Sequence, residues 1–316
     1  MKVIDLINSS KSTAFSFEIL PPLKGNSIQK VYNVIDKLIE FDPKYINITS
    51  HHSEYIYKTL PDGSFQKVNI RKRPGSVAIA SAIQNKYGIT AVPHIICKGF
   101  TKDETEYALI DLNFLGVYDL LLLRGDVKTL EAGQKTDIYH EHATDLQQQV
   151  NDFNKGIAID GSVFEANETP FSYGMACYPE KHEEAPNMES YIFYLKEKVK
   201  NGADYLVTQM FFDNEKYYAF VDRCRAEGIT VPIIPGIKPI VFKNQLTVLP
   251  KIFRSDIPEP FATELRKCKT DDEAKAVGVE WCIQQCKDLI AHGVPSLHFY
   301  TMMASDSVYK VAKEVY

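Results

Sequence analysis

The chain has 316 residues, and its ordinary balance of 45% hydrophobic and 24% charged residues excludes a disordered, collagenous or coiled-coil protein. A chain of this length can hold a core without disulfides or structural metals. Its net charge of −5 argues against a nucleic acid or an anionic membrane surface as partner, because both attract a basic face.

Eight short segments rich in β-branched and aromatic residues are predicted to be strands. Several are apolar on both faces, as strands in a buried parallel sheet are. In chain order the predicted strands are Ala14–Pro21, Tyr45–Ser50, Thr90–Cys97, Asp119–Gly125, Ser172–Tyr178, Tyr205–Phe212, Val231–Ile237 and Ser296–Met302.

Longer amphipathic segments between these strands are predicted to be helices. Thr101 and Glu104 have the spacing of a capping box, and a glycine follows four of the helices where it can end them. In chain order the predicted helices are Ile28–Glu40, Ser76–Lys86, Lys102–Leu115, Ala143–Phe153, Ser190–Asn201, Glu215–Glu227, Asn244–Phe253 and Asp272–His292, with further helices near Glu259–Cys268 and after Ser305.

This alternation of eight strands and helices predicts one α/β domain over residues 1–316, folded as a (β/α)8 TIM barrel with extra helices. A doubly wound open sheet is the alternative. That fold would carry a glycine-rich phosphate turn after the first strand, where this chain has Glu18-Ile-Leu-Pro-Pro22. The sequence therefore favours the barrel.

Two segments interrupt the alternation. Ser53–Pro74 is polar, ends in a basic run and is too long for an ordinary loop, so we interpret it as a functional lid or ligand loop. Asn154–Pro170 precedes the fifth strand and is interpreted as a tolerated insertion or an oligomer contact.

The sequence also predicts a cytoplasmic compartment without membrane attachment. The first twenty residues do not resemble a secretory signal, and no stretch is long and apolar enough for a membrane helix. The six cysteines are scattered, as reduced thiols of a cytoplasm are. Cys282 and Cys286 are four apart, and we interpret them as an apolar helix face rather than as metal ligands.

Polar side chains stand at the predicted ends of nearly all the strands, where a barrel of this kind has its active site. They are Glu18, Thr49, His51, His52, His94, Arg124, Asp126, Tyr178, Glu180, His182, Gln209, Asp213, Lys238, His298 and Tyr300. Stability alone does not require polar residues at these positions. The histidines and acids do not show the spacing of a barrel hydrolase's metal ligands, so no metal site is predicted.

Glu18 and Asp126 are the leading catalytic candidates. Glu18 interrupts an apolar strand, and a carboxyl group in such surroundings has a raised pKa that suits a general acid. The alternative is a structural ion pair with an arginine or lysine. Asp126 follows Gly125, and its charge would stabilise a cationic intermediate or tune an electron-rich ring. The alternative there is a capped turn with a local ion pair.

Seven motifs together resemble the methylenetetrahydrofolate reductase family, in that family's order and across essentially the whole chain. They are Phe17-Glu18-Ile-Leu-Pro-Pro22, Pro93-His94, Leu123-Arg-Gly-Asp126, Tyr178-Pro-Glu-Lys-His182, Leu195-Lys-Glu-Lys-Val199, Thr208-Gln-Met-Phe-Phe-Asp213 and Pro235-Gly-Ile237. The length resembles the bacterial form, which consists of the catalytic domain only.

The resemblance implies a flavin-dependent oxidoreductase acting on a CH–NH bond. FAD would take a hydride from NADH or NADPH and, after that product leaves, pass it to 5,10-methylenetetrahydrofolate in a ping-pong sequence. The product would be 5-methyltetrahydrofolate, used for methionine biosynthesis within one-carbon metabolism. The partners implied are these small molecules and further copies of the chain, since members of the family form homo-oligomers.

Site residues follow from the resemblance position by position. Glu18 matches the general acid, Asp126 the acidic residue beside flavin and pterin, and Gln209 the pterin-binding glutamine; all three would contact substrate. The positions that match FAD contacts are Thr49, Arg73, His94, Arg124, Gly125, Asp126, His142, Tyr178, His182 and Lys198. His142 stands where the family often has tyrosine, and Leu249 stands near an aromatic substrate contact of some members.

Two other functions fit parts of this pattern. A flavin barrel resembling proline dehydrogenase has a similar architecture, and a flavin-free subunit of a redox complex would keep the fold without the activity. Gln209 and the Glu18 strand favour folate, and the presence of Asp126 beside them argues against an inactive scaffold. The preference between NADH and NADPH cannot be read from the sequence.

Overall fold

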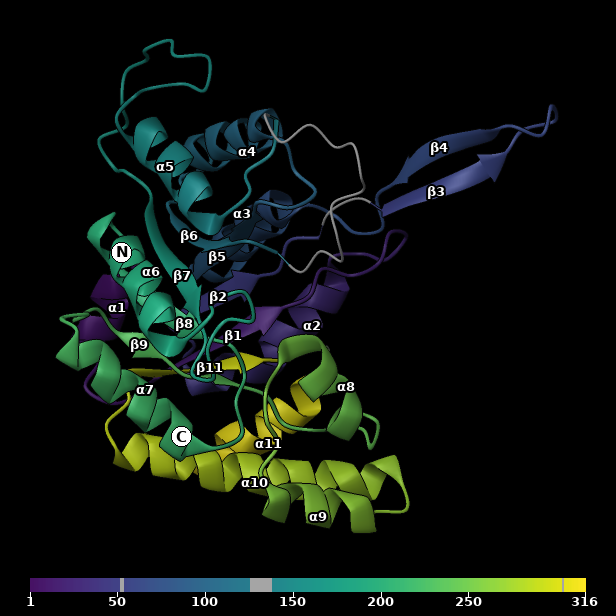
Figure 1. The fold of residues 1–316 in the computed structure, drawn as a ribbon, viewed down its shortest axis with the longest axis vertical. Helices are drawn as coiled ribbons and strands as arrows, with labels where there is room; N and C mark the ends of the chain where they lie inside the picture. The colour runs from purple at the N-terminus through teal and green to yellow at the C-terminus, as the bar shows by residue number, and fades with distance from the viewer. Residues whose placement is uncertain (52–53, 126–137, 303) are drawn as a thin grey trace. The chain divides into compact units, whose positions relative to one another are not determined.

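The computed structural model describes residues 1–51, 54–125, 138–302 and 304–316. It divides into two compact units (Figure 1). Unit 1 comprises Met1–Leu20, Asn33–Asn47 and Ser172–Tyr316, and unit 2 comprises Pro21–Tyr32 and Ile48–Phe171.

Unit 1 contains most of the parallel strands. They are β1 (Ala14–Ile19), β2 (Tyr45–Ile48, whose last residue belongs to unit 2), β7 (Ser172–Cys177), β8 (Tyr205–Thr208), β9 (Ile233–Ile234), β10 (Gly236–Ile237) and β11 (Ser296–Tyr300). Strand β8 pairs with β7 and β9, and β11 pairs with β10 and β1, in every case in parallel. The pairing of β1 with β11 joins strands from near the two ends of the chain.

The seventh predicted strand is split at Pro235. Its first half, β9, pairs with β8, and its second half, β10, pairs with β11. Proline has no N–H to donate to a neighbouring strand, but its carbonyl oxygen still accepts a hydrogen bond of 3.0 Å from the His298 N–H. The proline thus lets one strand change partners without leaving the sheet.

Side chains from β1, β10 and β11 form two levels on one face of the sheet. The lower level contains Ser16, Gly236 and His298, which are in register with one another. Two residues further along, Glu18 is opposite Tyr300, and Lys238 follows β10 at the same height. Side chains alternate along a strand, so the upper level points to the same side as the lower one.

Helices and an apolar cluster surround these strands in unit 1. The helices are α1 (Val3–Ser9), α6 (Met188–Lys200), α7 (Asn214–Ala226), α8 (Gln245–Phe253), α9 (Glu259–Lys267), α10 (Asp271–Ala291) and α11 (Ser305–Val315), with α2 (Gln29–Leu38) beginning in unit 2. Helix α10 runs alongside α9 and α11 (Figure 1). The Trp281 ring stacks on Phe261 at a centroid distance of 4.5 Å, which fixes α10 against α9.

Unit 2 contains the parallel pair β5 (Thr90–Ile96) and β6 (Asp119–Leu123) with helices α3 (Ser76–Tyr87), α4 (Lys102–Phe114) and α5 (Ala143–Asn154). The predicted capping box is present, because the Glu104 N–H donates to Thr101 Oγ1 at 3.1 Å and the Thr101 N–H donates to Glu104 Oε2 at 2.9 Å. The insertion after α5 folds on unit 2 itself, with the Phe153 and Phe164 rings 5.0 Å apart. Whether it is an oligomer contact stays a prediction.

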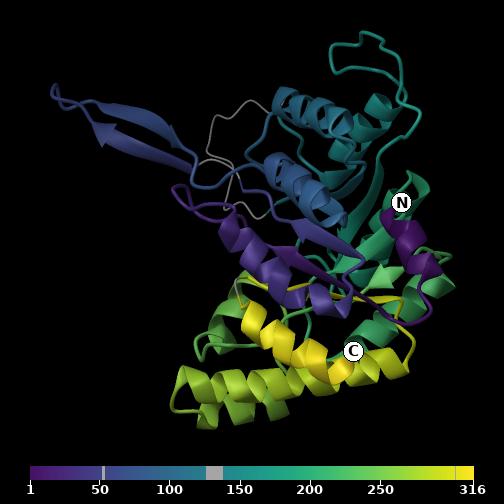
Figure 2. The same ribbon diagram turned by 180° about the vertical axis from the view of Figure 1, so that it is seen from behind.

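The segment Ser53–Pro74, interpreted from the sequence as a lid or ligand loop, is largely a β-hairpin whose two strands the sequence pattern did not predict. Strands β3 (Glu54–Thr59) and β4 (Phe65–Ile70) pair in antiparallel fashion and extend away from α3 and α4 of the same unit (Figure 2). Gly63 closes the turn with a φ of 81° that favours glycine, and Asp62 Oδ1 accepts the Ser64 N–H at 2.9 Å. A functional role for this hairpin stays a prediction.

The (β/α)8 barrel prediction is confirmed by the chain order of strands and helices and by their parallel pairing. All eight predicted strands are present, although several end earlier than expected, β8 by four residues. Helix α1 was not predicted. Among the described residues, none of the helices has the length and apolar character needed to cross a membrane.

Candidate active site

The predicted site residues divide between the two units. Unit 1 contains Glu18, Tyr178, His182, Lys198 and Gln209. Unit 2 contains Thr49, Arg73, His94, Arg124, Gly125 and His142. Asp126 and His52 lie outside the described residues.

Glu18 is the next-to-last residue of β1 and is partly buried. Its backbone carbonyl accepts a hydrogen bond of 2.6 Å from Thr301 Oγ1, which fixes the end of β1 to the residue after β11. Burial raises the pKa of Tyr300 opposite, and the Glu18 charge raises it further. The Tyr300 hydroxyl therefore stays protonated and donates to the Thr208 carbonyl at 2.6 Å.

Lys238 is the second ionisable group at this level. It is 2% exposed, and burial lowers its pKa to about 8, although the negative charge of Glu18 acts in the opposite direction. At neutral pH most Lys238 side chains therefore carry a positive charge. The sequence placed this lysine at the rim of the barrel but assigned it no role.

Gln209 directly follows β8. Its backbone N–H donates to the Cys177 carbonyl at 2.8 Å, and its own side-chain Oε1 accepts from the Met210 N–H at 2.9 Å. One lone pair of the amide oxygen is thereby used inside the chain. Among the described residues nothing else bonds to this amide group, so its second lone pair and its two N–H donors can serve a ligand with a mixed polar edge.

The segment after β7 holds Tyr178 and His182 against each other. Their rings meet edge to face with centroids 4.9 Å apart, and the Tyr178 N–H donates to the Tyr191 hydroxyl at 2.6 Å. Between them Lys181 has a φ of 75°, an uncommon conformation for a residue with a side chain. Its ammonium group donates to the His182 carbonyl at 3.2 Å, which stabilises the turn.

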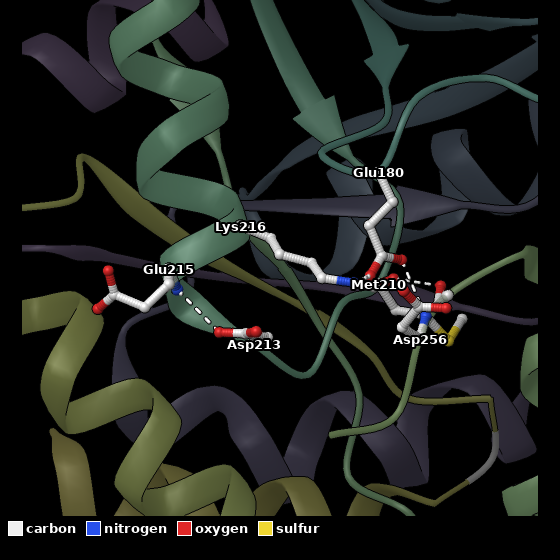
Figure 3. A network of polar contacts seen from close by, with 7 residues as sticks. Glu180, Met210, Asp213, Glu215, Lys216 and Asp256 are labelled. Atoms are coloured by element: carbon white, nitrogen blue, oxygen red, sulfur yellow. Dashed lines mark hydrogen bonds and ion pairs between the residues drawn. The ribbon is translucent and has the colours of Figure 1, made fainter. Parts of the chain in front are cut away.

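Glu180 of the same segment takes part in an ionic network (Figure 3). Lys216 of α7 contacts both Glu180, at 2.7 Å, and Asp256, while the Asp256 N–H donates to Glu180 Oε2 at 3.0 Å. Burial raises the pKa of Glu180, although the hydrogen bond from Lys216 lowers it. Ser255 Oγ also donates to the Met210 carbonyl at 2.6 Å. The network thus joins the segments that follow β7 and β8.

Lys198 lies on α6 and reaches back to the sheet. Its ammonium group donates to the Ala176 carbonyl of β7 at 3.1 Å. Asp213, another residue of the predicted rim, caps α7 by accepting the Glu215 N–H at 3.1 Å (Figure 3). Its position is therefore explained by helix capping.

A cavity in unit 2 brings three of the predicted FAD residues into one region. It has a volume of about 310 Å³, and both Arg73 and His94 line it. Thr49 is joined to the same wall, because its Oγ1 lies 3.0 Å from His51 Nε2. The lining residues are Ser50, His51, Arg71, Arg73, Gly75, Ser76, Val77, His94, Ile95, Ile96, Phe100, Glu104, Thr105, Tyr107, Ala108 and Asp111.

One wall of this cavity is suited to an anion. Arg71 and Arg73 stand beside Gly75 and Ser76, where α3 begins. The first N–H groups of a helix and its dipole add partial positive charge to that of the two guanidinium groups. Arg71 was not among the predicted site residues, although its place two residues before Arg73 in a basic run could have indicated it.

Arg124, Gly125 and His142 lie outside the lining of that cavity. Gly125 has a φ of 88°, which favours glycine there, and an added Cβ would lie 3.5 Å from Ile96. Arg124 Nε donates to the Glu141 carbonyl at 3.2 Å, which places it next to His142 in the chain. The His142 N–H donates to Asp145 Oδ2 at 2.9 Å, so this residue begins α5.

Comparison with known sequences decides the family. The sequence model of the family described as methylenetetrahydrofolate reductase matches residues 2–316 of this chain. The chain belongs to the methylenetetrahydrofolate reductase family. Its relatives include 5,10-methylenetetrahydrofolate reductase of Escherichia coli, which is 30% identical over 94% of this chain and 88% of the relative. The predicted family resemblance is confirmed.

Two eukaryotic reductases of the family are longer. The probable methylenetetrahydrofolate reductase (NADPH) of Caenorhabditis elegans is 30% identical over 99% of this chain and 43% of its own length. Methylenetetrahydrofolate reductase (NADH) 1 of Arabidopsis thaliana is 31% identical over 97% of this chain and 49% of its own length. The chain thus spans less than half of either relative, and their names differ in the electron donor.

A solved structure has a fold similar to that of this chain. An uncharacterized protein from Clostridium thermocellum, described as binding two copies of 5-methyl-5,6,7,8-tetrahydrofolic acid, has a TM-score of 0.54. It is 14% identical, and the match covers 98% of both chains. This likeness supports the barrel fold assigned above.

Proposed function

We propose that the chain reduces 5,10-methylenetetrahydrofolate to 5-methyltetrahydrofolate, with FAD as the hydride carrier and NADH or NADPH as the donor. Family membership over residues 2–316 supports the reaction class. The observation that carries the proposal is the pair of polar side chains at the ends of β1 and β8, namely Glu18 and Gln209. Both stand where a barrel enzyme binds its substrate.

The residues of each unit fit a flavin dinucleotide. A diphosphate requires cationic and N–H donors, which Arg71, Arg73 and the start of α3 provide in unit 2. In unit 1, Lys198 is a further cation, and Tyr178 is an aromatic ring beside His182. We propose that residues 1–316 form one flavin-binding domain with Thr49, His94, Arg124, Gly125, Asp126 and His142 as additional contacts. When bound, FAD would supply the transfer of a hydride from the nicotinamide to the folate.

Glu18 would act as the general acid. Its carboxyl O–H bond breaks as a new N–H bond forms at N10 of the folate, so that the five-membered ring opens to a reactive iminium cation and a carboxylate remains on Glu18. Gln209 would orient the pterin with the donors and the lone pair that its bond to Met210 leaves available. Asp126 would provide the negative charge beside the cation and the flavin.

One experiment tests the whole proposal. Purified protein would be incubated anaerobically with FAD, NADH or NADPH and 5,10-methylenetetrahydrofolate, and the folate products separated by chromatography and mass spectrometry. We expect absorption near ~450 nm from bound flavin and formation of 5-methyltetrahydrofolate. A flavin-loaded protein that oxidises the nicotinamide yet forms no 5-methyltetrahydrofolate would overturn the folate assignment.

The cellular setting follows from the same reaction. A product of this kind supplies methyl groups for methionine biosynthesis, and we propose that the enzyme acts in the cytoplasm as a homo-oligomer. Size-exclusion chromatography with light scattering measures the oligomeric state directly. A strictly monomeric protein at assay concentration would contradict that part of the proposal.

A further inference from the structure

Lys238 occupies an unusual position for a lysine. It directly follows β10, and the register of β10, β11 and β1 places it at the level of Tyr300 and Glu18. Helix α10 packs against the next residues of the segment, since the Ile240 carbonyl oxygen leaves no space for a side chain at Gly278. Cys282, one turn further along α10, is the other titratable group whose charge acts on Lys238. The lysine is thus enclosed by β1, β11 and α10.

This lysine has no close partner to stabilise its charge. Among the described residues, none forms a hydrogen bond with its ammonium group or an ion pair within 4.0 Å of it. Burial therefore disfavours its charged form, and the pKa of Lys238 falls to about 8. An apolar side chain of similar length would fill the same space at a smaller free-energy cost. The retained positive charge calls for a functional explanation.

The nearest such explanation is Glu18, whose negative charge acts on Lys238 across the same level of the sheet. We propose that Lys238 is a positioning residue for Glu18. The Lys238 ammonium group stabilises the carboxylate that remains on Glu18 after Glu18 gives its proton to the folate. This inference rests on the proposed function, because it concerns the acid of that reaction. Lys238 gives up no proton in this step. The O–H bond of Glu18 breaks as the N–H bond at N10 of the folate forms, and the negative charge left on Glu18 faces the Lys238 ammonium group.

The charge of Lys238 also determines the pH range in which Glu18 works. A neighbouring cation lowers the pKa of a carboxyl group. Among the described residues, the titratable groups whose charges act on Lys238 are Glu18 and Cys282, and Tyr300 lies at the same level of the sheet. Tyr300 stays neutral because burial raises its pKa. Removing the ammonium charge should therefore make Glu18 a weaker acid that remains protonated to higher pH.

The test is the pH profile of the folate half-reaction in Lys238→Met. Reduced flavin on the enzyme would be mixed with 5,10-methylenetetrahydrofolate in an anaerobic stopped-flow instrument between pH 5.5 and about 9. In Lys238→Met, the pH at which the rate declines should be higher than in the wild type by about one unit or more. We expect the rate below the decline to fall roughly tenfold, because the weaker acid gives up its proton less readily.

Two further variants make the result specific. Lys310→Met, on the exposed side of α11, is the matched control and should keep the wild-type profile. Lys238→Arg keeps a charge that does not titrate, and it should retain the wild-type position of the decline even if its larger side chain lowers the rate. A wild-type profile in Lys238→Met, or an effect confined to the KM for folate, would overturn the inference.

A second readout does not depend on the folate. The unfolded chain holds the lysine proton up to about pH 10.5, whereas the folded chain releases it at about pH 8, so the stability of the wild type should rise between these values. Lys238→Met should lose this rise in thermal unfolding, whereas Lys310→Met should keep it. If the rise is present and folate is not reduced by the wild type, the proposed function fails. If folate is reduced and the variant profile is unchanged, only the role of Lys238 fails.

Discussion

The two levels of side chains on β1, β10 and β11 of unit 1 differ in charge. In the lower level Ser16 Oγ lies 2.9 Å from His298 Nδ1, and burial lowers the pKa of His298 to about 3. In the upper level Lys238 keeps its charge at neutral pH beside Glu18. The same strands thus hold a neutral polar pair in one layer and an acid with a cation in the next.

The difference shows how a barrel separates stability from chemistry. His298 is fully buried and stays neutral because burial lowers its pKa, and no charge of the described residues acts to keep a proton on its ring. Ser16 Oγ also lies 3.2 Å from the Leu297 carbonyl oxygen, so this hydroxyl has hydrogen-bond partners on the β11 backbone and on the His298 ring. The layer two residues further along each strand reaches the end of the sheet, where substrates bind. Charge is retained only there.

The acid sensitivity of the lower level is the largest expected effect. The folded pKa of His298 is about 3 against 6.5 in the unfolded chain, so unfolded chains bind more protons as the pH falls below 6.5. The protein should lose about 5 kcal/mol of stability between pH 6.5 and 3 through this group, at 1.36 kcal/mol for each pH unit. Denaturant unfolding at several pH values measures it.

A histidine substitution separates this effect from general acid denaturation. His298→Phe should flatten the dependence on pH below 6.5. His292→Gln changes an exposed histidine next to Asp288 at the end of α10 and should retain the steep dependence that His298 produces. An equal loss of stability in His298→Phe and the wild type on acidification would show that the lower level is not the sensitive layer.

The upper level should respond to substitution in catalysis. Glu18→Gln keeps the size of the side chain but removes its acid, and the folate half-reaction should slow by at least about 100-fold. Reduction of the flavin by NAD(P)H should be unaffected, because that step needs no proton from Glu18. Single-turnover kinetics of each half-reaction make the comparison. Equal losses in both would point to a structural role for this carboxyl group.

Gly236 tests the close packing between the two levels. An added Cβ would lie 2.3 Å from the Thr208 carbonyl oxygen and 2.5 Å from the Tyr300 ring, and the former is backbone that cannot easily move. Gly236→Ala should therefore destabilise the protein by about 3 kcal/mol and lower its Tm. Gly75→Ala is the control, because no atom lies within 4 Å of the added group there. A wild-type Tm in Gly236→Ala would contradict this packing.

Ser16 gives the smallest expected effect. Ser16→Ala removes the hydroxyl that is hydrogen-bonded to His298 and leaves the buried Nδ1 without that partner, at a cost of about 1–2 kcal/mol. The pH profile of the folate half-reaction should stay at its wild-type position, since the change lies one level below Glu18. Chemical denaturation and stopped-flow kinetics would be compared in the same preparation. A shifted profile would mean that the two levels are not independent.

The sequence predicted the fold through patterns that are local. Each of the eight strands is a short apolar run bounded by turn residues, and burial on both faces makes such a run recognisable without its neighbours. Its ends are less predictable. The run Tyr205–Phe212 stays apolar beyond Thr208, where β8 ends, because the following aromatic residues are buried against other elements. Apolar character alone does not distinguish a residue buried in a strand from a residue buried in the segment that follows the strand.

Weak local signals account for two errors in the prediction. The hairpin β3–β4 is mostly exposed, so its strands lack the apolar pattern that marks the others, although the sequence Pro61-Asp62-Gly63 is a recognisable turn. Helix α1 has only seven residues, too few to be stable alone, and it is held by the burial of Val3 and Ile7. Its existence depends on contacts that the sequence pattern does not display.

For the candidate site, the sequence by itself determined which residue types end the strands, and Glu18 was recognisable because a carboxyl group interrupts an apolar run. Only the tertiary structure decided which of these residues share an environment. Glu180 proved to be an ionic partner of Lys216, whereas Lys238 proved to be a buried cation level with Glu18. The position of Lys238 level with Glu18 depends on the pairing of β1 with β11, which lie more than 200 residues apart, and the loss of solvent there changes the free energy of a charge.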